Sequence, residues 1–166
     1  MPSSLASPRA LCTLLFAVAL TPHALLAWQP GDPWIIAALT SNTAVKPALA
    51  EAERCAAQRD YAQAAEALGG LLAQDDAAVR GELDAPRGGQ PPLRLIALAA
   101  HAQYLQLHEN WRVSDALCAE AEAALASYAA AARGQRWFPY NVLLDATLGY
   151  YIRRNDSNNT ARLFDL

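Results

Sequence analysis

Alanine is the feature of this sequence that most restricts its fold. Roughly a quarter of the residues are alanine, which has the highest helix propensity of the amino acids and whose small side chain lets paired helices approach closely. Hydrophobic residues make up 54% of the chain and charged residues 17%, so it is too apolar to be disordered along its length. These proportions predict an all-α protein, and 166 residues suit one domain.

The charge balance limits the classes of partner. The chain has 13 Lys and Arg residues against 16 Asp and Glu residues, a formal net charge of −3 and an isoelectric point near 5.5. A dedicated nucleic-acid-binding protein would carry a basic face, so we expect no nucleic-acid partner. Lys46 is the single lysine. This alanine- and arginine-rich, nearly lysine-free usage favours an origin in a GC-rich bacterium.

The N-terminus has the pattern of a secretion signal. Arg9 precedes an apolar run over residues 10–20, Pro22 interrupts the helix, and the small residue Ala27 suits the position before a cleavage point. We therefore expect residues 1–27 to be a signal peptide, with its helix outside the fold, and the protein to be periplasmic or secreted. The alternative is an uncleaved membrane anchor, because the uncharged stretch could nearly span a bilayer.

The remaining sequence is expected to form helices separated by helix breakers. Residues 28–46 should form a short helix and a linker, with Asp32 as the N-cap, Pro33 as the first helical residue and a helix over residues 34–39. Residues 47–166 should form a domain of antiparallel helical hairpins, with a Gly- and Pro-rich loop at about 75–92 that includes a helical turn at 77–83. The helices expected in this domain span about residues 47–58, 61–73, 93–107, 111–133, 139–154 and 159–166.

Two of these helices carry further signals. The segment 93–107 is apolar nearly all round, which is typical of a central, buried helix. Trp111 is expected to open the next helix and Gly134 to end it, since glycine commonly follows the last helical residue.

Three helix–turn–helix segments repeat along the chain. They begin at residues 52, 102 and 149, so successive copies are 50 and 47 residues apart. Each copy has a small residue in its first helix and a polar turn, and in the first two copies an aromatic residue follows the turn. The residues that we expect to pack the repeats are Ala52, Tyr61, Ala64, Ala102, Trp111 and Gly149.

This arrangement resembles the tetratricopeptide (TPR) pattern, in which small residues allow two helices to approach closely and an aromatic residue fills the turn. The resemblance implies a short TPR-like α-solenoid of stacked hairpins and a protein or peptide partner. The copies are longer than the usual 34 residues of this repeat. A generic helical bundle is the alternative, because any antiparallel pair of helices in an alanine-rich protein needs small residues.

Motifs that carry catalysis are not found. The sequence contains no G-x-S-x-G motif, no phosphate-binding glycine loop and no C-x-x-C motif, and the histidines lack the spacing of a zinc site. We therefore expect no enzyme activity, no cofactor and no metal. Arg94, His101 and His108 share one helix face, which is expected to face solvent or a partner. An enzyme with a dispersed site formed by His101, His108 and Glu109 is a less favoured alternative.

Two cysteines follow the predicted signal. Cys55 and Cys118 could pair in an oxidising compartment. The favoured interpretation is that each is a small apolar residue buried between helices.

Aromatic and basic residues are concentrated towards the C-terminus. Aromatic side chains supply large contact areas in protein interfaces, so these residues are candidates for partner binding, with core packing as the alternative. The candidates are Trp111, Trp137, Tyr150, Tyr151, Arg153 and Arg154. The third hairpin has no capping helix, so we expect either a longer protein or a partner docked on its open face, with self-association as one form of docking.

The pattern favours an exported scaffold that binds another protein or a peptide and has no chemistry of its own. A second hypothesis is the periplasmic sensory input region of a longer membrane signalling protein that continues after residue 166.

Overall fold

The computed structural model describes residues 32–40, 44–108 and 114–165. The predicted signal peptide and Trp111 lie outside the described residues. The chain divides into two compact units, Met1–Asp32 and Pro33–Leu166, and the description below concerns the second unit.

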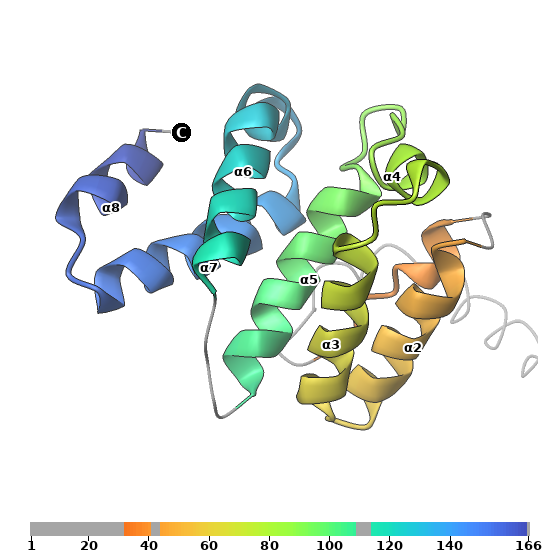
Figure 1. The fold of residues 1–166 in the computed structure, drawn as a ribbon. Helices are drawn as coiled ribbons and strands as arrows, with labels where there is room; N and C mark the ends of the chain where they lie inside the picture. The colour runs from red at the N-terminus through yellow and green to blue at the C-terminus, as the bar shows by residue number, and fades with distance from the viewer. Residues whose placement is uncertain (1–31, 41–43, 109–113, 166) are drawn as a thin grey trace, which may run out of the picture. The chain divides into compact units, whose positions relative to one another are not determined.

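The described residues are helical, with no strand and one isolated bridge between Arg87 and Gln90. The prediction of an all-α protein is confirmed. One 3-10 turn, η1, spans Ala37–Leu39, and seven α-helices follow it (Figure 1). They are α2 (Lys46–Ala57), α3 (Tyr61–Leu72), α4 (Ala77–Leu83), α5 (Leu93–Leu107), α6 (Asp115–Gln135), α7 (Phe138–Arg153) and α8 (Ser157–Phe164).

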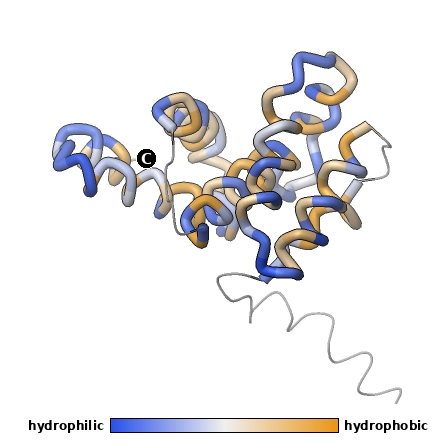
Figure 2. Tube along the Cα trace, turned by 60° about the horizontal axis from the view of Figure 1, so that its bottom comes forward, coloured by the Kyte–Doolittle hydropathy of each residue, from blue (hydrophilic) through white to orange (hydrophobic). Residues whose placement is uncertain are grey.

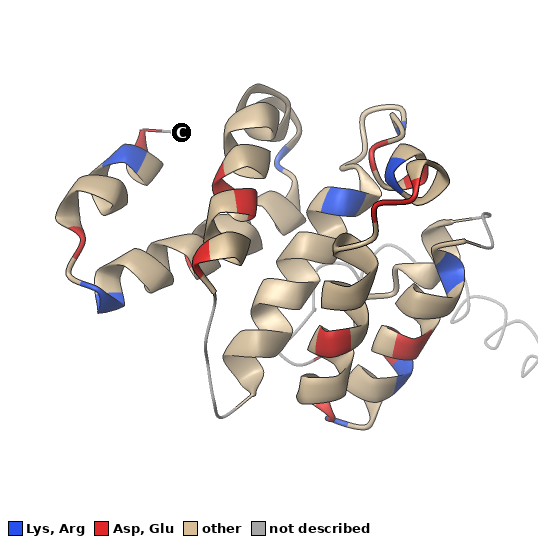
Figure 3. Ribbon diagram, in the orientation of Figure 1, with Lys and Arg blue, Asp and Glu red and all other residues tan. Residues whose placement is uncertain are grey.

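Helix α5 is the centre of this unit, as its apolar sequence predicted. It packs against α3 on one side and α7 on the other, while α2 packs on the far side of α3 (Figure 1). Ten of its residues are buried, and Arg94 is its single charged residue (Figure 3). Along the other helices hydrophobic and hydrophilic residues alternate, as amphipathic packing requires (Figure 2).

A histidine lies in the contact between α3 and α5. The Nδ1 atom of His101 is 2.8 Å from the carbonyl oxygen of Ala65. A Cβ atom placed on Gly69 would lie 2.9 Å from Cε1 of the same ring. The missing side chain of Gly69 therefore leaves the space that the imidazole occupies. His101 was expected on a face open to solvent or a partner, and that expectation is wrong because α3 covers it.

The segment before α2 differs from the predicted helix over residues 34–39. Only η1 is helical, because tertiary hydrogen bonds hold the preceding backbone groups. Glu53 Oε1 accepts from the amides of Ile36 and Ala37, the latter at 2.7 Å. The Trp34 amide donates to the Tyr104 hydroxyl at 3.0 Å. The segment is thus fastened to α2 and α5.

Helix α6 differs from prediction at both ends. It begins at Asp115, where the Ser114 side chain caps the amide of Leu117, and not at Trp111. It continues through Gly134, because Arg136 adopts the left-handed conformation (φ 51°) that ends the helix. It also packs mainly against α7 and little against α5, so α5 and α6 do not form the predicted closed hairpin.

The α2–α3 turn and the α7–α8 turn have the same backbone conformation. Arg59 and Asn155 both have a positive φ, 61° and 55°. Asp60 and Asp156 follow them, and each side chain caps its helix by accepting from the amide three residues on, at 3.2 and 3.1 Å. Four hydrogen bonds between backbone groups around the first turn have equivalents around the second, while the additional bond from the Gln58 amide to the Arg54 carbonyl, at 3.3 Å, belongs to the first turn alone.

This correspondence corrects the alignment of the third copy. Equivalent residues in the two turns are 96 positions apart, as Asp60 and Asp156 are. The sequence alignment matched Ala52 with Gly149, which is one position too far. The structural equivalent of Ala52 is Leu148. The error arose because the glycine looked like the small residue of the repeat.

No helix among the described residues is both long and apolar enough to cross a membrane.

Substitution of the two adjacent glycines of α3 tests the α3–α5 contact. Gly69→Ala should lower the free energy of unfolding by about 1–2 kcal/mol, because the new Cβ displaces the His101 ring from its hydrogen bond. Gly70→Ala is the matched control, since an added Cβ meets nothing within 4 Å there, and it should raise stability by about 0.5–1 kcal/mol. Urea denaturation of both variants measures the difference, and equal effects would contradict the packing described.

The same histidine predicts a pH dependence. Burial lowers the pKa of His101 below its ordinary value of 6.5, against a smaller opposing effect of the hydrogen bond to Ala65. The unfolded chain therefore binds a proton that the folded chain excludes. This contribution to stability is complete above about pH 6.5 and is lost as the pH falls through the lowered pKa. Urea denaturation at about pH 7.5 and 5.5 should show a larger loss in the wild type than in His101→Gln. Identical losses would show that His101 is not the group responsible.

Candidate functional site

Two hollows lie beside the α7–α8 turn, one bordered by α6 and α7 and the other by α7 and α8, and they share Asp156. The polar hollow has a volume of about 320 Å³ and is lined by Asp115, Cys118, Ala119, Glu122, Tyr150, Tyr151, Arg154 and Asp156. The apolar hollow has a volume of about 450 Å³ and is lined by Ile152, Asn155, Asp156, Ser157, Thr160, Ala161 and Phe164.

Local interactions set the position of α8. Asp156 caps the helix through the amide of Asn159, and the Thr160 hydroxyl donates to the Asp156 carbonyl at 2.7 Å. Leu163 is 1% exposed and anchors the helix against the rest of the unit. Arg162 Nη2 lies 2.7 Å from each carboxylate oxygen of Glu122, which joins α8 to α6.

The polar hollow contains a hydrogen-bonded triad that joins α6 to α7. The Tyr150 hydroxyl donates to Asp115 and accepts from Arg154, and Arg154 also donates to Asp115 at 2.5 Å. The guanidinium carbon lies 4.9 Å from the centre of the Tyr150 ring, within the range of a cation–π contact. The hydrogen bond from Tyr150 and the charge of Arg154 lower the pKa of Asp115, so this carboxylate is ionised at neutral pH.

A thiol lies deeper in the polar hollow. Cys118 is 2% exposed, and burial raises the pKa of its thiol. Burial and hydrogen bonds to Glu122 and Cys118 raise the pKa of Tyr151. A reactive cysteine needs a lowered pKa and access to solvent. Cys118 has neither of these features.

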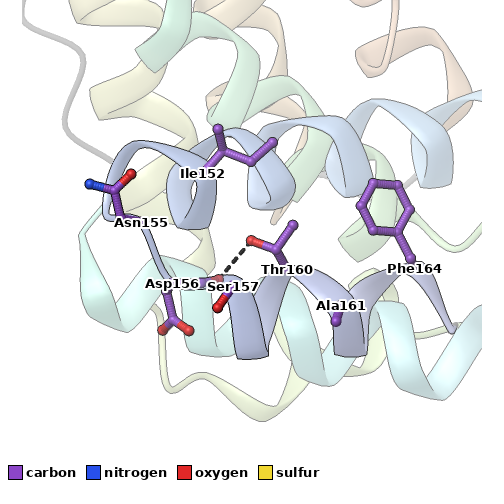
Figure 4. A pocket seen from close by; sticks show the side chains of 7 residues that line it. All are labelled: Ile152, Asn155, Asp156, Ser157, Thr160, Ala161 and Phe164. Atoms are coloured by element: carbon purple, nitrogen blue, oxygen red, sulfur yellow. Dashed lines mark hydrogen bonds between the residues drawn. The ribbon is translucent and has the colours of Figure 1, made fainter.

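The apolar hollow has a hydrophobic rim open to solvent. Figure 4 shows Ile152, from α7, and Thr160, Ala161 and Phe164, from α8, around it. Ile152 is 58% exposed and Phe164 is 69% exposed. Large hydrophobic side chains that stay this exposed, next to a charged hollow, form a surface of the kind that protein interfaces use.

The structure brings together three of the predicted partner-binding residues. Tyr150, Tyr151 and Arg154 all line the polar hollow, although Tyr150 is largely buried with its ring edge-on to that of Tyr151. Arg153 is exposed at the end of α7 and lines neither hollow.

Trp137 lies elsewhere. It precedes α7, whose other end carries Tyr150, so thirteen residues of helix, roughly 20 Å, separate the two. Its Nε1 atom donates to the carbonyl of Gly89 at 2.9 Å, and its ring contacts Tyr128 with the centroids 6.3 Å apart. Trp137 therefore holds the loop before α5 against the α6–α7 turn.

The predicted repeat-packing residues occupy mixed environments. Ala52, Ala64 and Ala102 are at most 2% exposed, and Gly149 is half-buried. Tyr61 stacks on Tyr104, with 6.1 Å between the ring centroids.

The cysteines and histidines have simple roles in the fold. Cys55 and Cys118 are free and buried in α2 and α6, which confirms the favoured interpretation that they do not pair. His101 is packed between helices and His108 ends α5, while Glu109 lies outside the described residues. Within the described ranges no three His, Cys, Asp or Glu side chains group to hold a metal ion.

Sequence reasoning missed several residues of the site. Asp115 and Glu122 were not singled out because single acidic residues on helices are common. Ile152 and Phe164 were not singled out either, since an apolar residue at helical spacing usually marks the core. The available signal was the uncapped third hairpin, which predicted an open apolar face without naming its residues.

No protein-family model, curated protein or solved structure matches this chain.

Proposed function

We propose that this protein is an exported scaffold that binds another protein or a peptide through the surface formed by α6, α7 and α8, with no catalysis of its own. The observation that carries the proposal is the pair of adjoining hollows, one charged and aromatic and one apolar. Interfaces combine a hydrophobic centre with polar groups at the rim, and tyrosine and arginine are enriched among the residues that contribute most binding energy.

Export rests on the sequence of residues 1–27, with its single charge at Arg9, its apolar run and Ala27 before the cleavage point. The acidic net charge of the whole chain agrees with a partner other than nucleic acid.

We further propose that the helices form a short TPR-like array. The support is the matching conformation of the α2–α3 and α7–α8 turns, including the positive φ and the capping aspartate. The middle copy departs from the pattern, because Ser114 caps α6 six residues after His108 ends α5. The array is therefore a degenerate one, with two regular turns and one long connection.

A charge reversal in the polar hollow tests the binding role. Full-length chain carrying a C-terminal tag should retain a specific protein from the exported fraction, and Arg154→Glu should reduce the amount retained at least several-fold. The reason is that the glutamate introduced at position 154 would repel Asp115 and reverse the charge that this position presents in the polar hollow. Quantitative mass spectrometry of the retained proteins measures the effect.

Arg80→Glu is the matched control, because the side chains of Arg80 and Arg154 are similarly exposed, 53% and 55%, and Arg80 lies on α4. It should retain the same protein as the wild type. Equal retention by both variants, or no specific protein, would contradict the binding role. A tagged chain that stays out of the exported fraction would contradict export.

A further inference from the structure

The apolar hollow repeats a face that is covered elsewhere in the same chain. Because the α2–α3 and α7–α8 turns share one conformation, residues 96 positions apart are equivalent around them. On the first hairpin the face consists of Ala56, Ala64, Ala65 and Leu68. Their equivalents are Ile152, Thr160, Ala161 and Phe164, which are among the residues that line the apolar hollow in Figure 4.

The two faces differ in burial. On the first hairpin these four residues are at most 2% exposed. On the second hairpin Ile152 and Phe164 are more than half exposed, at 58% and 69%. The same turn conformation thus precedes a covered face in one place and an open face in the other.

A helix covers the α3 part of the first face. Helix α5 packs along α3, and His101 contacts the carbonyl of Ala65 at 2.8 Å. One turn further along α5, Tyr104 stacks on Tyr61 at the start of α3. An occupant that follows the same geometry on α8 is therefore an α-helix, and its long axis runs along α8.

The differences between the faces define the chemistry of that helix. Asp165 occupies the position of Gly69, so a carboxylate stands where the His101 ring packs on the first hairpin. A cationic side chain suits this position. Phe164 and Ile152 are bulkier than their equivalents Leu68 and Ala56, so the occupant needs small residues opposite them.

We propose that the face formed by Ile152, Thr160, Ala161 and Phe164 binds one α-helix of a partner protein, with a stripe of alanine and leucine against the apolar residues and a lysine or arginine opposite Asp165. This inference rests on the proposed function and names the kind of partner. Binding of an amphipathic helix in an apolar groove is a common mode of recognition.

A peptide derived from α5 can be used to test binding to this face. A synthetic peptide that copies residues 92–108, with His101→Lys and a fluorescent label, carries the apolar stripe of α5 and the required cation. We expect it to bind the full-length chain with a Kd on the order of micromolar, measured by fluorescence anisotropy. The double variant Ile152→Asp, Phe164→Asp should weaken binding at least tenfold, because both charges enter the apolar contact.

Ile35→Asp is the matched control. Ile35 is also a highly exposed hydrophobic residue, at 71%, and it lies before η1, so this variant should bind the peptide as the wild type does. Because Ile152 and Phe164 are exposed, the double variant should fold. Thermal unfolding monitored by circular dichroism checks this. A peptide with the additional substitution Tyr104→Asp, at the position that stacks on Tyr61 of the first hairpin, should not bind.

Three results would overturn the proposal. One is the absence of binding at about 100 μM peptide, and another is binding that the double variant leaves unchanged. The third is self-association of the wild type in sedimentation velocity that the double variant abolishes, because the occupant would then be a second copy. If the peptide fails while Arg154→Glu still removes a captured partner, the proposed function stands and only the helical occupant is wrong.

Discussion

The close approach of α3 and α5 is the constraint on which the rest of the unit depends. Gly69 leaves space for the His101 ring, and the ring binds the Ala65 carbonyl, so the two helices meet with little between them. Helix α5 is then fixed as the buried centre, and α7 packs on its other side. The Trp34 amide donates to the Tyr104 hydroxyl of α5, so the core around α5 extends to the start of the described chain.

The C-terminal end of the unit contains the same turn in a different setting. The α7–α8 turn copies the α2–α3 turn, yet Ile152 and Phe164 on its apolar face are exposed, and no helix among the described residues covers them. Ion pairs hold this end instead, through Arg162 with Glu122 and Arg154 with Asp115. Charged contacts between exposed groups contribute little stability individually, so the buried Leu163 side chain is the stronger anchor of α8.

Sequence periodicity predicted the helices that tertiary contacts did not disturb. Helix α5 has the bounds that its apolar run indicated, and ten of its residues are buried. The prediction of a helix over residues 34–39 was wrong, because the amides of Ile36 and Ala37 donate to Glu53, a residue of α2, instead of to carbonyl groups within a helix. In the candidate site the aromatic and basic residues of α7 were identified from their clustering. Ile152 and Phe164 were not, since a spacing pattern marks an apolar residue as core whether or not another helix covers it.

The most direct test of this account is the contact between His101 and Gly69 in solution. The distance of 2.9 Å from the ring Cε1 to an ideal Gly69 Cβ places the ring against the glycine α-protons. A nuclear Overhauser spectrum of the full-length chain should therefore show a strong cross-peak between the His101 Hε1 proton and the Gly69 α-protons. If that cross-peak is absent while those within α3 and within α5 are present, the helices do not meet as described. The equivalence between the covered and the open face would then lose its basis.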